Sequence, residues 1–136
     1  MNLRSLQRLD RAHPALKKLF IEVAKKCPVD IEISETVRTE TRQKELVKAG
    51  ASRTMNSRHI ASVPKHEWYG TKPVSHAVDF YCTLNGKVRW DWHLYKIVAD
   101  HVKIVAKQLG IQVVWGGDWK SFKDGPHVEL DRKIYP

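Results

Sequence analysis

A chain of 136 residues suits one compact domain, here taken as residues 1–136. Its hydrophobic fraction of 42% is ordinary for a globular protein, and no stretch approaches the roughly 20 apolar residues that a membrane span needs. The net charge of +9 favours an anionic polymer as partner, but charge alone does not distinguish nucleic acid from the polyanions of a bacterial wall.

Three elements are predicted in the first part of the chain. Apolar side chains recur at helical spacing from Leu16 until Pro28 forbids continuation of the helix. Residues 30–37 alternate apolar and polar side chains, as a half-buried strand does. A second helix is expected to begin after Thr39, which can cap it, and to end at Gly50.

A long segment without periodicity, residues 51–74, follows these elements. It is rich in Ser, Asn, Gly, Pro and charged residues, which indicates a surface loop. A loop of this length is unusual in a small domain and is often functional.

The remaining elements complete the predicted fold. Residues 77–84 favour a strand, and Asn85-Gly86 is a strong hairpin-turn signal. The clearest helix covers residues 91–109. Two more short strands are predicted, at residues 111–115 and 127–130. Because helices and strands do not alternate regularly, we expect an α+β fold: a small, mainly antiparallel sheet with flanking helices in a single domain.

Seven histidines raise the question of a metal site. A catalytic zinc typically takes three ligands from His, Asp and Glu and leaves a fourth position for water. No HExxH motif is present, which excludes a site with two ligands from such a motif on one helix. A site with ligands from separate strands and loops is the alternative. Taken singly, the signals at His59, Asp79 and His127 are weak, since each side chain also has an ordinary structural interpretation.

Three short segments, taken together and in order, resemble a known family. They are Ser57-Arg58-His59, Ala77-Val78-Asp79 and Asp124-Gly125-Pro126-His127. They are similar to the pattern SxHxxGxAxD followed by an acidic residue three positions before a His. This pattern is typical of the M15 group of zinc peptidases, which holds D-Ala-D-Ala carboxypeptidases and dipeptidases and the L-alanyl-D-glutamate endolysins of tailed phages. The small size of the chain is closest to the phage endolysins.

The resemblance implies a role for each of five residues. His59, Asp79 and His127 would bind Zn²⁺ and leave its fourth position for water. Asp124 would act as general acid–base, and Arg38 would hold the developing oxyanion or a substrate carboxylate. The alternative for Arg38 is an ordinary surface arginine paired with a neighbouring glutamate.

The chain departs from the family pattern at one point. The family usually places the first His seven residues before the Asp, whereas His59 and Asp79 lie 20 residues apart. We interpret residues 61–73 as an insertion into the connecting loop, lying at the rim of the zinc cleft and closing over bound peptide. His66, inside this insertion, is the alternative first ligand, although the sequence around His59 matches the family better.

Other residues carry weaker expectations. Trp68, Tyr69 and Trp119 are candidates for lining a substrate cleft. Asp118 and Glu129 are candidates for orienting the ligand imidazoles, because metal-bound histidines usually donate their second ring N–H to such a group.

The function that the resemblance implies is a zinc-dependent endopeptidase that cleaves the L-alanyl-D-glutamate bond of bacterial peptidoglycan, causing host cell lysis. No secretory signal is visible, so we expect the protein to stay in the host cytoplasm until a separate holin-type protein releases it to the periplasmic wall. We also expect it to be a monomer. A D-Ala-D-Ala carboxypeptidase is the alternative within the family. A nucleic-acid-binding protein is a weaker hypothesis, because the basic residues are dispersed and no nucleic-acid-binding motif appears.

Overall fold

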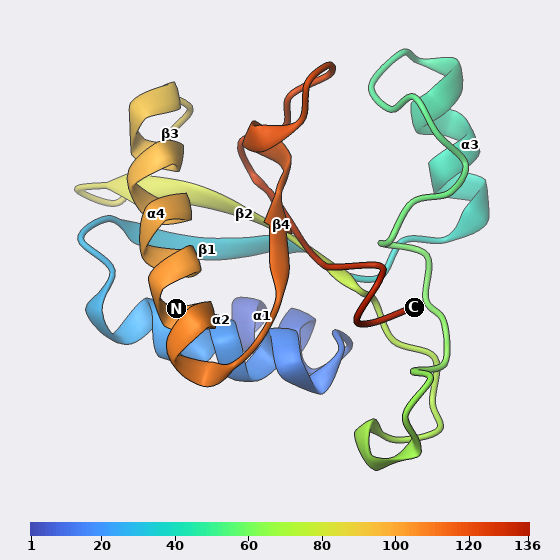
Figure 1. Ribbon diagram of the computed structural model, residues 1–136. Coiled ribbons are helices and arrows are strands. Elements are labelled where there is room, and N and C mark those ends of the chain that lie inside the picture. The colour runs from blue at the N-terminus through green and yellow to red at the C-terminus, as the bar shows by residue number, and fades with distance from the viewer.

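The computed structural model describes residues 1–136 (Figure 1). Its elements are four α-helices, two single 3₁₀ turns (η) and five strands. In chain order they are α1 (Leu3–Leu9), α2 (Pro14–Lys26), β1 (Asp30–Glu35), α3 (Glu40–Lys48), η1 (Glu67–Tyr69), β2 (Ala77–Leu84), β3 (Lys87–Arg89), α4 (Trp92–Leu109), β4 (Val113–Trp115), η2 (Gly116–Asp118) and β5 (His127–Leu130). No helix has the length and apolar character that a bilayer span requires.

All strands belong to one sheet, which confirms the α+β prediction. The order is β1-β2-β5-β4, β3 pairs with β2, and every pair is antiparallel. The hairpin predicted between β2 and β3 is present, with Asn85 and Gly86 both at positive φ, as a two-residue turn of this kind requires. In Figure 1 the sheet runs through the middle of the molecule, with α1, α2 and α4 near it and α3 set apart.

The hydrophobic core lies between the sheet and the helices. Side chains alternate between the two faces of a strand, so Val78, Phe80 and Cys82 of β2 enter the core together with Val128 of β5. The residues between them therefore face the other side of the sheet, where no helix of the core covers them. The functional side chains lie on this second face.

Two predicted strands are shorter than expected. The ladder between β1 and β2 is irregular between Ile33 and Glu35, and β1 ends at Glu35 instead of residue 37. β4 begins only at Val113, because the N–H of Ile111 donates to Ala106 O and closes the end of α4. The short α1 was not predicted from the sequence.

The long loop of residues 51–74 is largely irregular, as predicted, apart from η1. The backbones of Ser62 and Val74 form two hydrogen bonds of 3.0 Å, which close the base of the segment interpreted as an insertion. Residues 61–73 therefore leave the body of the chain and return to it at nearly the same place.

Candidate metal centre

The first two residues of the site are neighbours in the sheet. Asp79 of β2 and His127 of β5 are register partners, so their side chains leave the same face of the sheet side by side. The third residue, His59, lies in the long loop. Its carbonyl accepts from Arg38 N at 2.9 Å, and the carbonyl of Arg58 accepts from His76 N at 2.9 Å. These backbone bonds hold the loop against the sheet, so that His59 lies beside Asp79.

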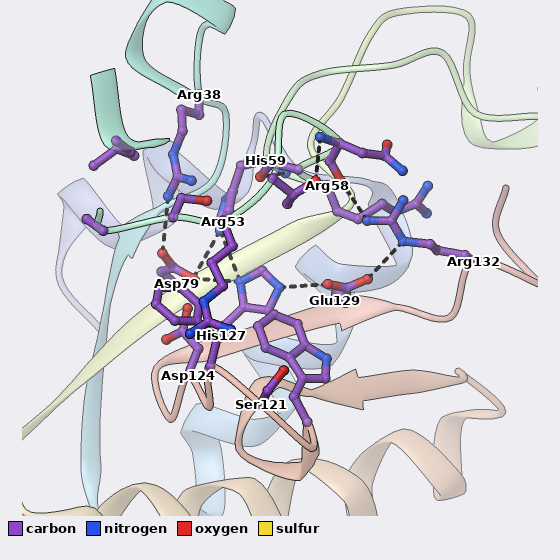
Figure 2. Close-up of a pocket in the computed structure, with 18 residues that line it drawn as sticks. Arg38, Arg53, Arg58, His59, Asp79, Ser121, Asp124, His127, Glu129 and Arg132 are labelled. Atoms are coloured by element: carbon purple, nitrogen blue, oxygen red, sulfur yellow. Dashed lines mark hydrogen bonds and ion pairs between the residues drawn. The ribbon is translucent and has the colours of Figure 1, made fainter. Parts of the chain in front are cut away.

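The three side chains meet at a single point (Figure 2). Nε2 of His59 lies 3.0 Å from Oδ1 of Asp79 and 3.2 Å from Nδ1 of His127, and the last two atoms are 3.0 Å apart. A tetrahedral zinc with bonds of about 2.0–2.1 Å places its ligand atoms roughly 3.3 Å apart. The cluster therefore has the dimensions of a metal site and could hold a metal ion.

Hydrogen bonds outside the cluster direct the imidazole lone pairs into it. Nδ1 of His59 lies 2.8 Å from the carbonyl oxygen of Thr36, which can only accept, so the proton of this ring is on Nδ1. Nε2 of His127 lies 2.9 Å from Oε1 of Glu129, which places its proton on Nε2. Both inward-facing nitrogens are then acceptors, as is the Asp79 oxygen. Three lone pairs directed at one point repel one another and are stabilised by a cation between them, so the cluster could hold a metal ion.

The electrostatics of the cluster favour positive charge. Burial lowers the pKa of His127, but the hydrogen bonds to Asp79 and Glu129 outweigh it and raise that pKa to about 9. Burial raises the pKa of Asp79, but its contacts with His59 and His127 outweigh burial and hold that pKa well below its usual range. Without a metal ion, a proton takes the place of the cation.

The cluster lies in a cavity of about 390 Å³, a volume within the range of sites for small organic ligands. Asp124 and Arg38, to which the resemblance gives roles at the site, also line the cavity, as does Trp119, a separate candidate for lining the cleft. The ring of Trp119 lies 5.0 Å from that of His127. The other lining residues are Leu46, Ala51, Ser52, Arg53, Thr54, Asn56, Ser57, Arg58, Ser121, Phe122, Glu129 and Arg132.

Asp124 is brought to the cavity by a close approach of two backbones. Its N–H donates to the carbonyl of Gly116 at 3.0 Å, and a Cβ at position 116 would overlap the carbonyl oxygen of Asp124. Only glycine fits there. Burial and the negative charge of Asp79 raise the pKa of Asp124, against the lowering effect of nearby cationic groups. A carboxyl group with a raised pKa is suited to carrying a proton.

Arg38 is held from two sides. Its Nε donates to Oε1 of Glu35 at 2.8 Å, a second nitrogen contacts the same oxygen, and a third donates to Oε1 of Gln43 at 2.8 Å. One nitrogen also lies 3.6 Å from Oδ2 of Asp79. Arg38 is thus paired with a glutamate and also lies beside the metal cluster. Three of its five N–H groups are used, which leaves two for a substrate.

The structure corrects the expectation for the insertion. Trp68 and Tyr69 do not line the cavity, so their predicted role there is wrong. The ring of Tyr69 packs 4.4 Å from that of His13, and Trp68 is 72% exposed and stacks on His66 at 4.2 Å. Residues 61–73 lie away from the cavity, because Tyr69 packs against the body of the domain. His66 is not a member of the metal cluster.

Of the two residues expected to orient the ligand imidazoles, one contacts a ligand histidine and the other does not. Glu129 contacts His127, as expected. Asp118 does not contact a ligand: its exposed carboxylate pairs with Lys103 of α4 at 2.6 Å, so the expectation for Asp118 is wrong. A sequence pattern does not show which way a side chain in a 3₁₀ turn points.

Sequence reasoning missed several cavity residues. Arg53, Arg58 and Arg132 bring three more cations to it, and Phe122 adds an apolar wall. Arg58 belongs to the motif around His59, which could have drawn attention to it. Arg53 and Arg132 are far apart in sequence and have no such signal, because only the fold brings them together.

Comparison with known proteins identifies sequence relatives of this chain. A family model described as phage L-alanyl-D-glutamate peptidase matches residues 1–135. The L-alanyl-D-glutamate peptidase of Listeria phage A118 is 32% identical over 126 residues, which are 93% of this chain and 39% of that protein. The peptidoglycan L-alanyl-D-glutamate endopeptidase CwlK of Bacillus subtilis strain 168 is 34% identical over 108 residues, 75% of this chain and 61% of that protein. The chain thus spans less than two thirds of the length of either relative.

A solved structure shows the same fold. The crystal structure of the Serratia marcescens L-Ala D-Glu endopeptidase ChiX superposes with a TM-score of 0.84 at 35% sequence identity. The match covers 98% of this chain and 91% of that one. The similarity therefore extends over nearly the whole length of both chains.

Proposed function

The chain belongs to the phage L-alanyl-D-glutamate peptidase family, and we propose from this membership that it is a zinc-dependent peptidoglycan hydrolase. The bond cleaved is the one between L-alanine and D-glutamate in the stem peptides of the bacterial wall. In this proposal the protein is a phage endolysin, which lyses the bacterial host.

One observation of the site carries this proposal. His59, Asp79 and His127 direct three lone pairs at one point, and the outer hydrogen bonds to Thr36 and Glu129 fix the ring protons on the far side. Two histidines and one carboxylate form a ligand set that zinc uses in catalytic sites with an open fourth position. Because the cluster lines the cavity, a metal ion held there would be accessible to water and substrate from that side.

A zinc ion bound there would supply a nucleophile from water at neutral pH and would polarise a carbonyl oxygen. Asp79 and the two histidines would hold the metal, and the cavity walls would orient the peptide beside it. One guanidinium nitrogen of Arg38 lies 3.6 Å from Asp79, so this fixed positive charge beside the cluster can stabilise the negative charge that develops on the carbonyl oxygen.

Asp124 carries the proton in this proposal. It takes the proton of the attacking water and delivers it to the leaving amine of the glutamyl residue, so one carboxyl group serves both halves of the reaction. Its raised pKa supports the role, because a stronger base accepts the proton from water more readily.

The net charge of +9 fits a substrate that is part of an anionic polymer. We further propose that the protein acts as a monomer, that it accumulates in the host cytoplasm, and that a separate holin-type protein gives it access to the periplasmic wall. We propose peptidoglycan, and not nucleic acid, as the partner.

Lysis of bacterial cells with a permeabilised outer membrane tests this function. We expect the turbidity of the suspension to fall when the protein is added, to remain constant with a chelator present, and to fall again once zinc is restored. Lysis at an unchanged rate in excess chelator would contradict the metal-dependent mechanism.

A further inference from the structure

Four arginines line the cavity, and three of them are already engaged by protein groups. Arg38 contacts Glu35 and Gln43. A nitrogen of Arg58 donates to the carbonyl of Tyr135. Nε of Arg132 lies 3.5 Å from Oε2 of Glu129, and another of its nitrogens donates to the carbonyl of Asn56 at 2.8 Å. Each of these three guanidinium groups therefore joins the cavity wall to another part of the chain.

Arg53 is the exception. It makes no hydrogen bond and no ion pair with any protein group, yet it lines the cavity. Its one specific contact is with the ring of Phe122, whose centroid lies 4.8 Å from the guanidinium carbon. Figure 2 draws Arg53 in front of the cluster formed by Asp79 and His127. A guanidinium placed over an aromatic ring is held in position and keeps its N–H groups free for a ligand.

Phe122 is itself in an unusual position. Its φ of 52° lies in the left-handed region, which bulky residues rarely adopt. The loop between η2 and β5 thus presents an aromatic ring to the cavity. The contact between Arg53 and Phe122 joins this loop to the loop that carries Arg53.

The proposed substrate carries the group that such a cation recognises. A glutamyl residue has two carboxyl groups, and continuation of the peptide uses only one. The other remains as a free carboxylate a few bonds from the amide nitrogen that is cleaved. Arginine binds carboxylates with two parallel hydrogen bonds, which provides geometric specificity as well as affinity.

We infer that Arg53 is the residue that recognises the free carboxylate of the glutamyl residue on the amine side of the cleaved bond, with Phe122 positioning its guanidinium. This inference rests on the proposed function. It gives Arg53 a part in specificity and leaves proton transfer and metal binding to the residues described above.

Two matched peptides test the inference. One contains L-alanyl-D-glutamate with its free carboxylate, and the other carries a carboxamide at that position, which has the same shape without the charge. We expect the wild-type protein to prefer the carboxylate peptide in kcat/KM by about 10- to 100-fold, the usual worth of a hydrogen bond to a charged group. Arg53→Gln should abolish the preference by losing activity on the carboxylate peptide only. Arg53→Lys should keep part of it, since lysine retains the charge but not the fork.

Arg42→Gln is the charge-matched control. Arg42 lies on the exposed face of α3, pairs with Glu45 and does not line the cavity, so this variant should keep the full preference. Phe122→Leu should weaken the preference without changing the charge. Equal losses on both peptides in Arg53→Gln, or a wild-type protein with no preference, would overturn the inference.

A binding measurement separates this inference from the proposed function. Calorimetry with the two glutamyl product peptides, carboxylate and carboxamide, requires no turnover. If the wild-type protein cleaves neither substrate, the proposed function fails. Even then, weaker binding of the carboxylate product to Arg53→Gln than to the wild-type protein supports the role of Arg53. Equal binding of that product to wild-type protein and Arg53→Gln overturns it.

Discussion

Nε2 of His127 lies 2.9 Å from Oε1 of Glu129, two residues further along the same face of β5. The carboxylate fixes the ring proton on the outer nitrogen and makes the inner nitrogen a better metal ligand. Glu129→Gln keeps the shape and removes the charge, so we expect zinc affinity to fall about 10- to 100-fold with the fold retained. Competition with a chromophoric chelator measures this affinity. Glu45→Gln removes the same charge from the exposed face of α3 and should leave the affinity unchanged; equal affinities in all three proteins would exclude the role of Glu129.

The identity of the first ligand can be decided by zinc analysis of three variants. His59→Ala and His127→Ala should each lose the bound zinc and some thermal stability, because metal binding contributes to the free energy of folding. His66→Ala should keep one zinc per chain, since His66 stacks on Trp68 away from the cluster. Loss of zinc in His66→Ala with retention in His59→Ala would reverse the assignment.

Asp124→Asn tests the proton carrier. The amide cannot accept a proton, so we expect turnover to fall by about 10²- to 10⁴-fold, the usual contribution of general acid–base catalysis. Zinc content and melting temperature should remain close to those of the wild-type protein. Near-normal turnover in Asp124→Asn would shift the role to another carboxylate of the cavity.

Two buried histidines outside the cavity predict a loss of stability in mild acid. Burial, followed by the positive charges nearby, lowers the pKa values of His13 and His76 to about 4. Both are therefore neutral in the folded state, whereas in the unfolded chain they take up protons near pH 6.5. Their contribution to stability is complete above pH 6.5 and is lost progressively as the pH falls towards 4.

Thermal denaturation at several pH values between 7.5 and 4.5 measures this loss. In the metal-free protein His127 adds an opposite slope above about pH 6, because its raised pKa of about 9 keeps it protonated in the folded state while the unfolded chain loses this proton near pH 6.5. Comparison with a variant that retains His127 removes this contribution. His76→Gln should show a smaller decline in melting temperature than the wild-type protein. An identical decline in both proteins would show that His76 is not the source.

The sequence and its family resemblance predicted most of the site but little of its surroundings. Asp79 and His127 lie in strands predicted from β-favouring residues and neighbouring turn signals, so both residues could be placed on strands before the structure was known. His59 depended on the family pattern, because a loop residue has no periodicity. The path of residues 61–73 could not be predicted, since the packing of Tyr69 on His13 joins residues with no common pattern.

The same limit applies to the arginines of the cavity. Nothing in the local sequence distinguishes Arg53, which has no protein partner, from Arg42, which pairs on the surface. The difference arises from the position of Phe122, nearly seventy residues later in the chain, and from the close approach of Gly116 to Asp124 that shapes its loop. Long-range contacts of this kind are set by the whole fold.

Mass spectrometry of purified peptidoglycan after digestion tests the central claim most directly. If the protein cleaves the L-alanyl-D-glutamate bond with zinc, digestion should produce peptides with a new N-terminal glutamate and should leave alanine on the glycan. A chelator should prevent both products, and zinc should restore them. Release of terminal D-alanine alone, or an unchanged set of wall fragments with the zinc-loaded protein, would contradict the account.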